Sequence, residues 1–440
     1  MEKFFENMRL LIGEEFSEFI KTRNEPPFRG LRVNTLKCSR ETVERNLPFE
    51  LESIPFCCDG YYIPSDFEGI GSHPLHHAGA FYVQEPSAMS AVTMLAPKKG
   101  ELVLDLCAAP GGKSSQIAAA LQGEGLLWAN EIVTSRANIL LSNLERLGVR
   151  NAVISSCRPQ TLCEKLGGVF DKILVDAPCS GEGMFRKDKN AVREWSEENV
   201  TACAERQLKI LESAKLALKS GGAIVYSTCT FSYEENEGVI SRFLERNPEF
   251  ELEDSKESFG RNTMKYAKRI FPMDGGEGHF AAKLRHKGEP SQEGAAGSAQ
   301  FKKAGSDAER MYENVFPSTP FGDALAVVGT KILALPEYIP PLDGLNILRA
   351  GVHLGDVCKN RIEPAHAAFM AARPQDCACS VNFSCDDGRL LRFLRGEEIE
   401  VSEALRGYTA VCADGVTVGF GKASNGTLKN KYPKGLRVKS

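Results

Sequence analysis

The sequence has 440 residues, of which 42% are hydrophobic and 25% charged, as in an ordinary globular protein with room for two or three domains. The net charge of −4 excludes a chain that is basic throughout, so any nucleic-acid-binding surface must be local. No stretch reaches the ~18 apolar residues of a membrane span, and the 14 cysteines follow no regular framework. We therefore expect a cytoplasmic protein with reduced thiols and no membrane association.

The chain opens with an acidic amphipathic stretch, "MEKFFENMRLLIGEEF" (1–16). It lacks the charged-then-apolar order of a secretory signal, which agrees with a cytoplasmic location.

Short apolar runs then alternate with helical patterns, which predicts a parallel, doubly wound α/β sheet. The expected strands are "ELVLDL", "GLLWANE", "NAVISS", "DKILVDAP", "GAIVYSTCT" and "GHFAAKL" (278–284). The expected helices are "KSSQIAAALQ", "TSRANILLSNLERLG" with Thr134 as its cap, and "NVTACAERQLKILESAKLALKSGG", ending at Gly221-Gly222. Ligands of such sheets bind at the carboxyl ends of the strands, so Cys107, Glu131, Cys179 and Cys229 should converge there.

The turn after the first of these strands, "LVLDLCAAPGGKSSQ" (102–116), ends like a phosphate-binding P-loop. A P-loop needs a glycine where this chain has Cys107, and Pro110 supplies no amide. A triphosphate cradle is therefore disfavoured. A buried strand, a small turn and a helix N-terminus still suit a nucleoside cofactor whose body approaches the backbone closely.

Acidic residues end two further strands. Glu131 follows the second strand, twenty residues after Gly111, where a carboxylate typically binds ribose hydroxyls. Asp176 ends the fourth strand, in "LVDAPCSGEGMFRK" (174–187), where it can face a nucleobase edge. Arg186 and Lys187 follow at the rim, where phosphates would pass.

Two cysteines occupy the same edge of the predicted sheet. Cys179 follows the fourth strand, and Cys229 ends the fifth in "VYSTCTFSYEENE" (225–237). A single cysteine is usually a buried structural residue. A pair at adjacent strand ends instead suggests a thiolate that adds to an electron-poor double bond.

The last third of the chain changes character. A polar, unpatterned stretch after His286 reads as a linker. Strands such as "GYTAVCADGVTVGFGKA" then suggest a β-rich module. The last twenty residues hold six Lys or Arg and no acid, which fits either a solvated tail or a phosphate-contacting patch.

The motifs "CAAPGGK", "DAPCSGEG" and "STCTFSYEENE", in this order and spacing, resemble the Sun/Fmu-type RNA cytosine carbon-5 methyltransferases, above all their RsmF-like branch, which modifies small-subunit ribosomal RNA. "RGLRVNTLK" (29–37) and "HHAGAFYVQEPSAM" (76–89) resemble its N-terminal segments. "GLNILRAGVHLGDVCKNRIEPAHAAF" and "GFGKASNGTLKNKYPKGLR" resemble its PUA-like RNA-binding region. The likeness covers nearly the whole chain.

This resemblance implies a Rossmann-like S-adenosylmethionine-dependent methyltransferase sheet, a small N-terminal segment and a β-rich PUA-like C-terminal module. The implied divisions are an N-terminal RNA-binding segment (1–75), the methyltransferase domain (76–286), a linker (287–313), an intermediate region (314–380) and the PUA-like module (381–440). We expect a monomer that binds ribosomal RNA and holds no metal.

The resemblance also assigns roles to residues. Cys229 would be the nucleophile, Cys179 would help to resolve the adduct, and Asp176 would lie near both cofactor and base. The implied cofactor-binding residues are Cys107, Ala108, Ala109, Pro110, Gly111, Gly112, Lys113, Glu131 and Asp176. The RNA-binding candidates are Arg32, Arg186, Lys187, Lys429, Lys431 and Lys434. Arg158 stands where the family often has an acid near the adenine, so that contact is left unassigned.

The thiols fit this chemistry because carbon 5 of cytosine is a poor nucleophile until a thiolate adds to carbon 6. The target base must be unpaired or flipped to enter such a pocket. Three alternatives stay open at this point: a transfer RNA methyltransferase, a non-catalytic RNA-binding assembly factor and, remotely, a P-loop NTPase.

Overall fold

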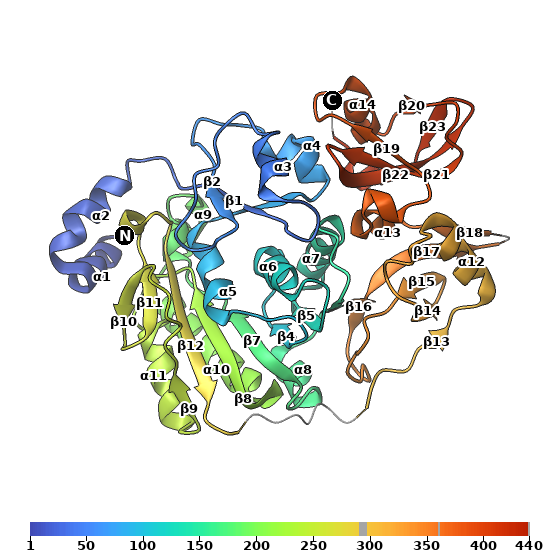
Figure 1. Cartoon of the computed structure of the whole chain (residues 1–440). Helices are drawn as coiled ribbons and strands as arrows, with labels where there is room; N and C mark the ends of the chain where they lie inside the picture. Colours follow the sequence, from blue (N-terminus) through green and yellow to red (C-terminus); the bar gives the residue numbers. More distant parts are fainter. Residues whose placement is uncertain (290–296, 360, 439–440) are drawn as a thin grey trace.

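A computed structural model describes residues 1–289, 297–359 and 361–438, and its helices and strands are shown in Figure 1. The centre of the molecule is a ten-stranded sheet of order β10-β11-β12-β8-β7-β4-β5-β6-β16, with β9 paired to β12 off this path. Its strands are β4 (Leu102–Asp105), β5 (Leu126–Asn130), β6 (Ala152–Ser155), β7 (Phe170–Asp176), β8 (Leu218–Thr228), β9 (Phe250–Leu252), β10 (Arg261–Thr263), β11 (Ala267–Ile270), β12 (His279–His286) and β16 (Ile347–Ala350).

The middle of this sheet is parallel and doubly wound. β4 pairs in parallel with both β5 and β7, β5 with β6, and β7 with β8. The chain runs from β4 outward through β5 to β6 and then returns to β7, so the winding reverses between β4 and β7. Ligands of open α/β sheets bind beside the carboxyl ends of the strands at such a switch point. The predicted Rossmann-like fold is confirmed.

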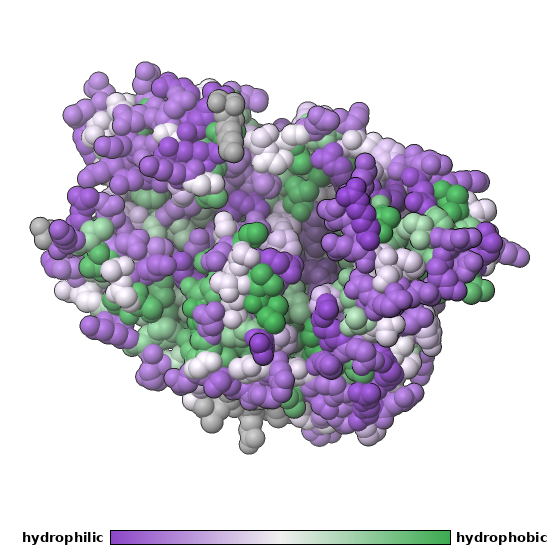
Figure 2. All heavy atoms as spheres, turned by 180° about the vertical axis from the view of Figure 1, so that it is seen from behind, coloured by the Kyte–Doolittle hydropathy of each residue, from purple (hydrophilic) through white to green (hydrophobic). Residues whose placement is uncertain are grey.

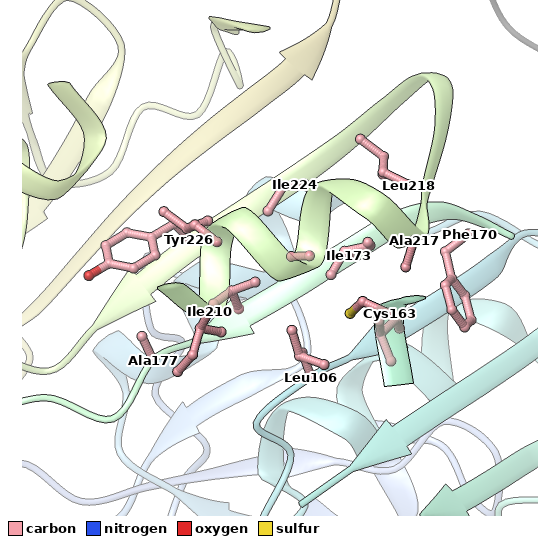
Figure 3. Close-up of a cluster of buried hydrophobic side chains, with 14 of the residues drawn as sticks. Leu106, Cys163, Phe170, Ile173, Ala177, Ile210, Ala217, Leu218, Ile224 and Tyr226 are labelled. Atoms are coloured by element: carbon pink, nitrogen blue, oxygen red, sulfur yellow. The ribbon is translucent and has the colours of Figure 1, made fainter. Parts of the chain in front are cut away.

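Helices cover both faces of the sheet (Figure 1). One face carries α5 (Ser90–Leu95), α6 (Gly112–Leu121) and α7 (Thr134–Arg146). The other carries α8 (Pro159–Lys165), α10 (Glu197–Ala217) and α11 (Glu237–Arg246). Figure 3 shows α10 against the sheet, with Ile210 and Ala217 facing Ile173 and Ile224. These apolar side chains are buried between the layers, and their removal from water supplies much of the driving force for folding.

One predicted helix end is wrong. α10 ends at Ala217, and Gly221-Gly222 lie inside β8, because Leu218 already pairs with Phe170. α7 begins at Thr134, as predicted, but Thr134 is its first residue and not its cap; the residue before the helix is Val133. The Thr134 hydroxyl is 3.1 Å from that of Ser156.

The N-terminal region forms a small sheet of order β2-β1-β3. Its elements are α1 (Glu2–Ile12), α2 (Phe16–Thr22), β1 (Gly30–Val33), α3 (Arg40–Glu44), β2 (Gly60–Tyr62), α4 (Pro74–His77) and β3 (Phe81–Gln84). β3 pairs with β1, so this sheet extends past the predicted boundary at residue 75. α1 and α2 bury Phe4 and Phe19 against Phe231 and Phe271 at one end of the central sheet.

The region after the central sheet is more ordered than predicted. Residues 290–296 of the expected linker lie outside the described residues, but β13 (Lys302–Lys303) and the start of α12 (Ser306–Val315) fall within 287–313. A five-stranded sheet, β13-β14-β15-β17-β18, follows. Its further elements are β14 (Leu325–Val328), β15 (Lys331–Ala334), β17 (Val352–Cys358), β18 (Arg361–Pro364) and α13 (His366–Ala371). β16, from the same stretch, pairs antiparallel with β6 and completes the central sheet.

The C-terminal module is β-rich, as predicted, with strand order β19-β21-β22-β23-β20. Its elements are β19 (Ser380–Phe383), α14 (Gly388–Arg395), β20 (Ile399–Glu400), β21 (Gly407–Ala413), β22 (Val416–Ser424) and β23 (Thr427–Asn430). Its core is continuous with that of the N-terminal sheet, since Leu31 and Phe81 belong to the same buried cluster as Phe393 and Val411. The N-terminal sheet and the C-terminal module therefore pack together.

The reverse face of the molecule, in Figure 2, is largely hydrophilic, with separate hydrophobic patches around a central hollow. No helix of the described residues has the length and apolar character to cross a membrane.

Candidate active site

The two predicted cysteines meet at the carboxyl edge of the central sheet. Cys229 directly follows β8, and Cys179 lies three residues after β7. Their Sγ atoms are 3.3 Å apart, and both side chains are partly exposed. The two thiols can therefore act on the same bound molecule.

Hydrogen bonds between the two cysteine-bearing loops fix this distance. The hydroxyls of Ser180 and Thr230 are 2.9 Å apart. The Ser180 amide donates to Glu235 (3.0 Å), and the Phe231 amide donates to Glu182 (3.0 Å). The loops are thus cross-linked on either side of the thiols.

Gly183 brings the loops into close backbone contact. Its amide donates to the Cys229 carbonyl at 2.9 Å. A Cβ at this position would lie 3.0 Å from that carbonyl oxygen and 2.9 Å from that of Gly278. Only glycine fits here without moving one of the loops.

The thiols differ in their surroundings. The contact with Cys229, followed by burial, raises the pKa of Cys179 well above its ordinary value. Cys179 therefore stays protonated and can donate its proton toward Cys229.

Asp176, the last residue of β7, is held by two donors. Lys113 Nζ donates to Oδ2 (2.8 Å), and the Ser227 hydroxyl donates to Oδ1 (2.8 Å). The recessed position of Asp176 would raise its pKa, but the charge of Lys113, with His279 and Ser227, outweighs that effect and lowers it. Asp176 is therefore ionised and can only accept hydrogen bonds.

The predicted cofactor loop, Cys107–Lys113, connects β4 to α6. Gly111 precedes the helix with φ 113°, a backbone conformation that suits glycine. A Cβ on Gly112 would lie 3.0 Å from the Tyr82 ring. The loop therefore presents backbone close to any bound molecule at the N-terminus of α6.

Asp105 and Ser114, which the sequence prediction missed, support this loop. The buried Asp105 accepts from Ser114 (2.6 Å) through Oδ2, while Oδ1 has no partner among the described residues. Burial raises the pKa of Asp105 to about 7. Asp105 ends β4 as Asp176 ends β7, and that shared position could have identified it.

Glu131 is buried directly after β5, as predicted. It accepts from the Val133 amide (2.9 Å) and pairs with Arg136 (3.1 Å). Burial raises the pKa of Cys107, and the negative charges of Asp105, Asp176 and Glu131 raise it further. Arg158, by contrast, is exposed before α8.

Arg32 and Arg186 are not placed for RNA contact. Arg32 is only 2% exposed and donates to Ser115 Oγ (2.7 Å) and the Gly112 carbonyl (3.2 Å), so it supports the start of α6. Arg186 has a side chain only 9% exposed, lies 3.6 Å from Glu277, and donates to the carbonyls of residues 25 and 26. Both guanidinium groups hold protein segments together.

The remaining RNA candidates lie nearer the surface. Lys187 is partly buried, and burial lowers its pKa. Lys429 and Lys434 are exposed, whereas Lys431 Nζ lies 3.5 Å from Glu363. Two of the three C-terminal lysines are thus free to meet a phosphate.

Family models match four parts of the chain. Residues 92–285 match "16S rRNA methyltransferase RsmB/F", and residues 1–86 match the N-terminal domain of 16S rRNA methyltransferase RsmF. Residues 311–371 match the first C-terminal domain of RsmF rRNA methyltransferase, and residues 380–438 match the RsmF PUA domain.

Relatives align along almost the whole chain. Ribosomal RNA small subunit methyltransferase F of Aliivibrio fischeri (strain MJ11) is 33% identical over 95% of this chain and 93% of its own. The protein of the same name from Vibrio vulnificus (strain YJ016) is 32% identical over 99% of this chain and 97% of its own.

Solved structures share the central fold. A methyltransferase homolog from Pyrococcus horikoshii is 32% identical, with a TM-score of 0.57 over 65% of this chain and 95% of its own. NSun6 from Pyrococcus horikoshii, solved with SFG, is 25% identical, with a TM-score of 0.58 over 65% of this chain and 98% of its own.

Proposed function

The chain belongs to the RsmF-type 16S rRNA methyltransferases, and from this premise we propose that it methylates carbon 5 of a cytosine through a covalent Cys229 adduct. It is an S-adenosylmethionine-dependent enzyme that acts on small-subunit ribosomal RNA. Our proposal concerns the choice of cytosine as the base, carbon 5 as the methylated atom and Cys229 as the residue that forms the covalent adduct.

The observation that carries this proposal is the pair of thiols 3.3 Å apart at the switch-point edge of the sheet. Methylation of an exocyclic amine or a ribose hydroxyl has no use for two cysteines in one pocket. Methylation at carbon 5 needs a nucleophile that adds to the ring and a second group that helps to reverse the addition.

The proposed reaction begins when the Cys229 thiolate adds to carbon 6 of the cytosine. The new S–C bond moves the ring's π electrons, so carbon 5 gains nucleophilic character and negative charge develops toward N3. After carbon 5 has been methylated, it still carries its proton. Loss of that proton to water restores the C5=C6 double bond and breaks the S–C bond, which releases Cys229 as a thiolate. We assign assistance in this release to Cys179, whose protonated thiol, 3.3 Å away, can donate to the leaving sulfur.

Asp176 orients the base in this scheme. Because its carboxylate is ionised, it accepts from the exocyclic amine of cytosine rather than donating to the ring. Lys113, in contact with Oδ2, holds the carboxylate in place.

The residues of the predicted cofactor site fit S-adenosylmethionine. We assign Cys107–Lys113 to its main body, Glu131 to its ribose hydroxyls, and the unpartnered Asp105 Oδ1 to its positively charged amino group. S-adenosylmethionine supplies an electrophilic methyl group when bound. We also propose that the enzyme acts in the cytoplasm as a monomer, since one chain holds the cysteine site, the cofactor loop and the PUA-like module.

Bisulfite sequencing of ribosomal and transfer RNA from a deletion strain tests the substrate. We expect one or more 16S rRNA cytosines to lose protection and transfer RNA to be unchanged. An unchanged 16S rRNA pattern would refute the proposal, and loss of protection in transfer RNA alone would redirect it.

Isothermal titration tests the cofactor site directly. S-adenosylmethionine should bind, and ATP-Mg should not, because Cys107 replaces the first P-loop glycine. Tight ATP-Mg binding with no response to S-adenosylmethionine would contradict the assignment.

A further inference from the structure

His279 lies beside the two cysteines but takes no part in holding their loops. It is the first residue of β12, which pairs antiparallel with β8, and this register joins Phe280 to Thr228. His279 and Cys229 therefore occupy the adjoining ends of the two strands. The imidazole Nε2 lies 4.0 Å from Oδ1 of Asp176.

The imidazole of His279 is buried and unpaired. Its side chain is 1% exposed, and neither ring nitrogen has a hydrogen-bond partner among the described residues. The 4.0 Å separation from Asp176 is too long for a hydrogen bond. A buried polar group without a partner costs about 1–3 kcal/mol, so such groups are rare unless a ligand or water satisfies them.

Other histidines do not share this arrangement. His76, His353 and His366 each leave one buried ring nitrogen unpaired, whereas His279 leaves both. His279 is also the one that lies next to the proposed base-binding carboxylate. Its unpaired nitrogens are therefore best explained by a partner that enters the active site.

The charge state of His279 decides which hydrogen bonds its ring can make. Burial, followed by the positive charge of Lys113, lowers its pKa to about 4, although Asp176 and Glu85 act in the opposite direction. At neutral pH the ring is uncharged and carries one N–H donor and one acceptor nitrogen.

The proposed reaction requires such a donor. Negative charge develops at N3 when the thiolate adds to carbon 6, and the ionised Asp176 cannot donate a hydrogen bond to it. Lys113 has its closest contact with Asp176. His279 carries an N–H on a ring whose Nε2 lies 4.0 Å from the carboxylate that would bind the adjacent amine.

We propose that the imidazole N–H of His279 donates to N3 of the target cytosine while Asp176 accepts from its exocyclic amine. This inference rests on the proposed cytosine carbon-5 function. A donor beside an acceptor matches N3 and the amine of cytosine and opposes uracil, whose N3–H and O4 present the reverse order. His279 thus both stabilises the adduct and selects the base.

The test combines a variant with an altered substrate. His279→Phe removes the donor from a buried, unpaired position, so the variant should melt no lower than the wild type and bind S-adenosylmethionine normally. Its single-turnover methylation should be roughly 10- to 100-fold slower, as expected for one lost hydrogen bond to a developing charge. His353→Phe, which alters a partly buried histidine outside the site, should methylate at the wild-type rate.

The altered substrate is RNA with 3-deazacytidine, which lacks N3, at the position found by bisulfite sequencing. Because N3 also takes up the charge of the adduct, its loss slows methylation by itself, so this RNA is compared by affinity and not by rate. The wild type should bind 3-deazacytidine RNA more weakly than cytidine RNA, and His279→Phe should bind the two equally, because the same hydrogen bond is already absent. Equal weakening in both enzymes would show that another group, such as Lys113, donates to N3, and would overturn the proposal.

The test can refute the proposal whether or not His279→Phe folds. If His279→Phe fails to fold, the wild type and His279→Asn, which keeps an N–H, carry the comparison, and equal affinities for cytidine and 3-deazacytidine RNA overturn the proposal. If His279→Phe folds and methylates at the wild-type rate, the role of His279 is refuted while the cytosine carbon-5 function stands. Failure of that function would instead appear as no cytosine methylation by the wild type.

Discussion

Glu131 is a carboxylate whose position is fixed before any ligand binds. Val133 and Arg136 hold it, yet each carboxylate oxygen keeps a further lone pair for a ribose hydroxyl. Glu131→Ala should weaken S-adenosylmethionine binding by about 1.5–3 kcal/mol, the contribution of hydrogen bonds to a charged group. Titration calorimetry measures this, with the exposed Glu124→Ala as control. Unchanged affinity would remove Glu131 from the site.

Arg32 stabilises the cofactor loop through hydrogen bonds to the start of α6. Arg32→Met leaves the Gly112 carbonyl and the Ser115 hydroxyl without their buried donor. We expect a loss of about 1–3 kcal/mol in the free energy of unfolding and weaker cofactor binding. The salt dependence of RNA binding should not change. Arg40→Met, which alters an exposed arginine, is the control in denaturant titrations. A smaller salt dependence of RNA binding in Arg32→Met would contradict this account and indicate that Arg32 contacts a phosphate.

The strands and loops of the central sheet place the chemistry, and Gly183 is where the two cysteine loops meet most closely. Gly183→Ala places a methyl group 3.0 Å from the Cys229 carbonyl oxygen. Separation of the loops should lower the methylation rate at least about 10-fold, and overpacking should cost about 1–3 kcal/mol of stability. Gly71→Ala, whose Cβ would meet nothing within 4 Å, is the matched control. A fully active Gly183→Ala enzyme would show that the loops need no such contact.

The elements nearest the site were the most predictable from the sequence. Strand-end residues such as Asp176 and Cys229 follow apolar runs, and parallel strands bring those ends to one edge. The end of α10 was not predictable in this way. Its helical pattern continues past Ala217, but pairing of Leu218 with Phe170 overrides it.

Contacts between segments far apart in the chain could not be predicted from the local sequence. β16 lies about 190 residues after β6 in the chain yet pairs with it, and the four residues of β16 give no sign of their partner. Likewise, nothing near Arg32 marks it as buried. Its burial follows from the packing of β1 beside α6, a contact between segments about 80 residues apart.

The N-terminal sheet and the C-terminal module share one buried core, which places the basic C-terminal stretch (422–438) next to the N-terminal sheet. Lys439 lies outside the described residues. Lys429 and Lys434 are exposed, whereas Lys431 is near Glu363, so the first two should contact RNA phosphates.

The double variant Lys429→Gln/Lys434→Gln should therefore flatten the salt dependence of RNA binding. The slope should fall by up to ~0.9 of a log unit per lost contact on a duplex target. Methylation at saturating RNA should change less than affinity does. Lys256→Gln/Lys302→Gln, which alters exposed lysines elsewhere, is the control. A wild-type slope in the first variant would mean that this stretch is only solvated.

The central claim is that Cys229 forms the covalent bond and Cys179 serves its release, and trapping the protein–RNA adduct tests it most directly. Cys179→Ala, incubated with 16S rRNA and S-adenosylmethionine, should accumulate an adduct that survives a denaturing gel. Cys229→Ala and the double variant should bind RNA but form none. An adduct in Cys229→Ala that is absent from Cys179→Ala would reverse the two roles. Full methylation by both single variants without any adduct would contradict covalent catalysis through these thiols.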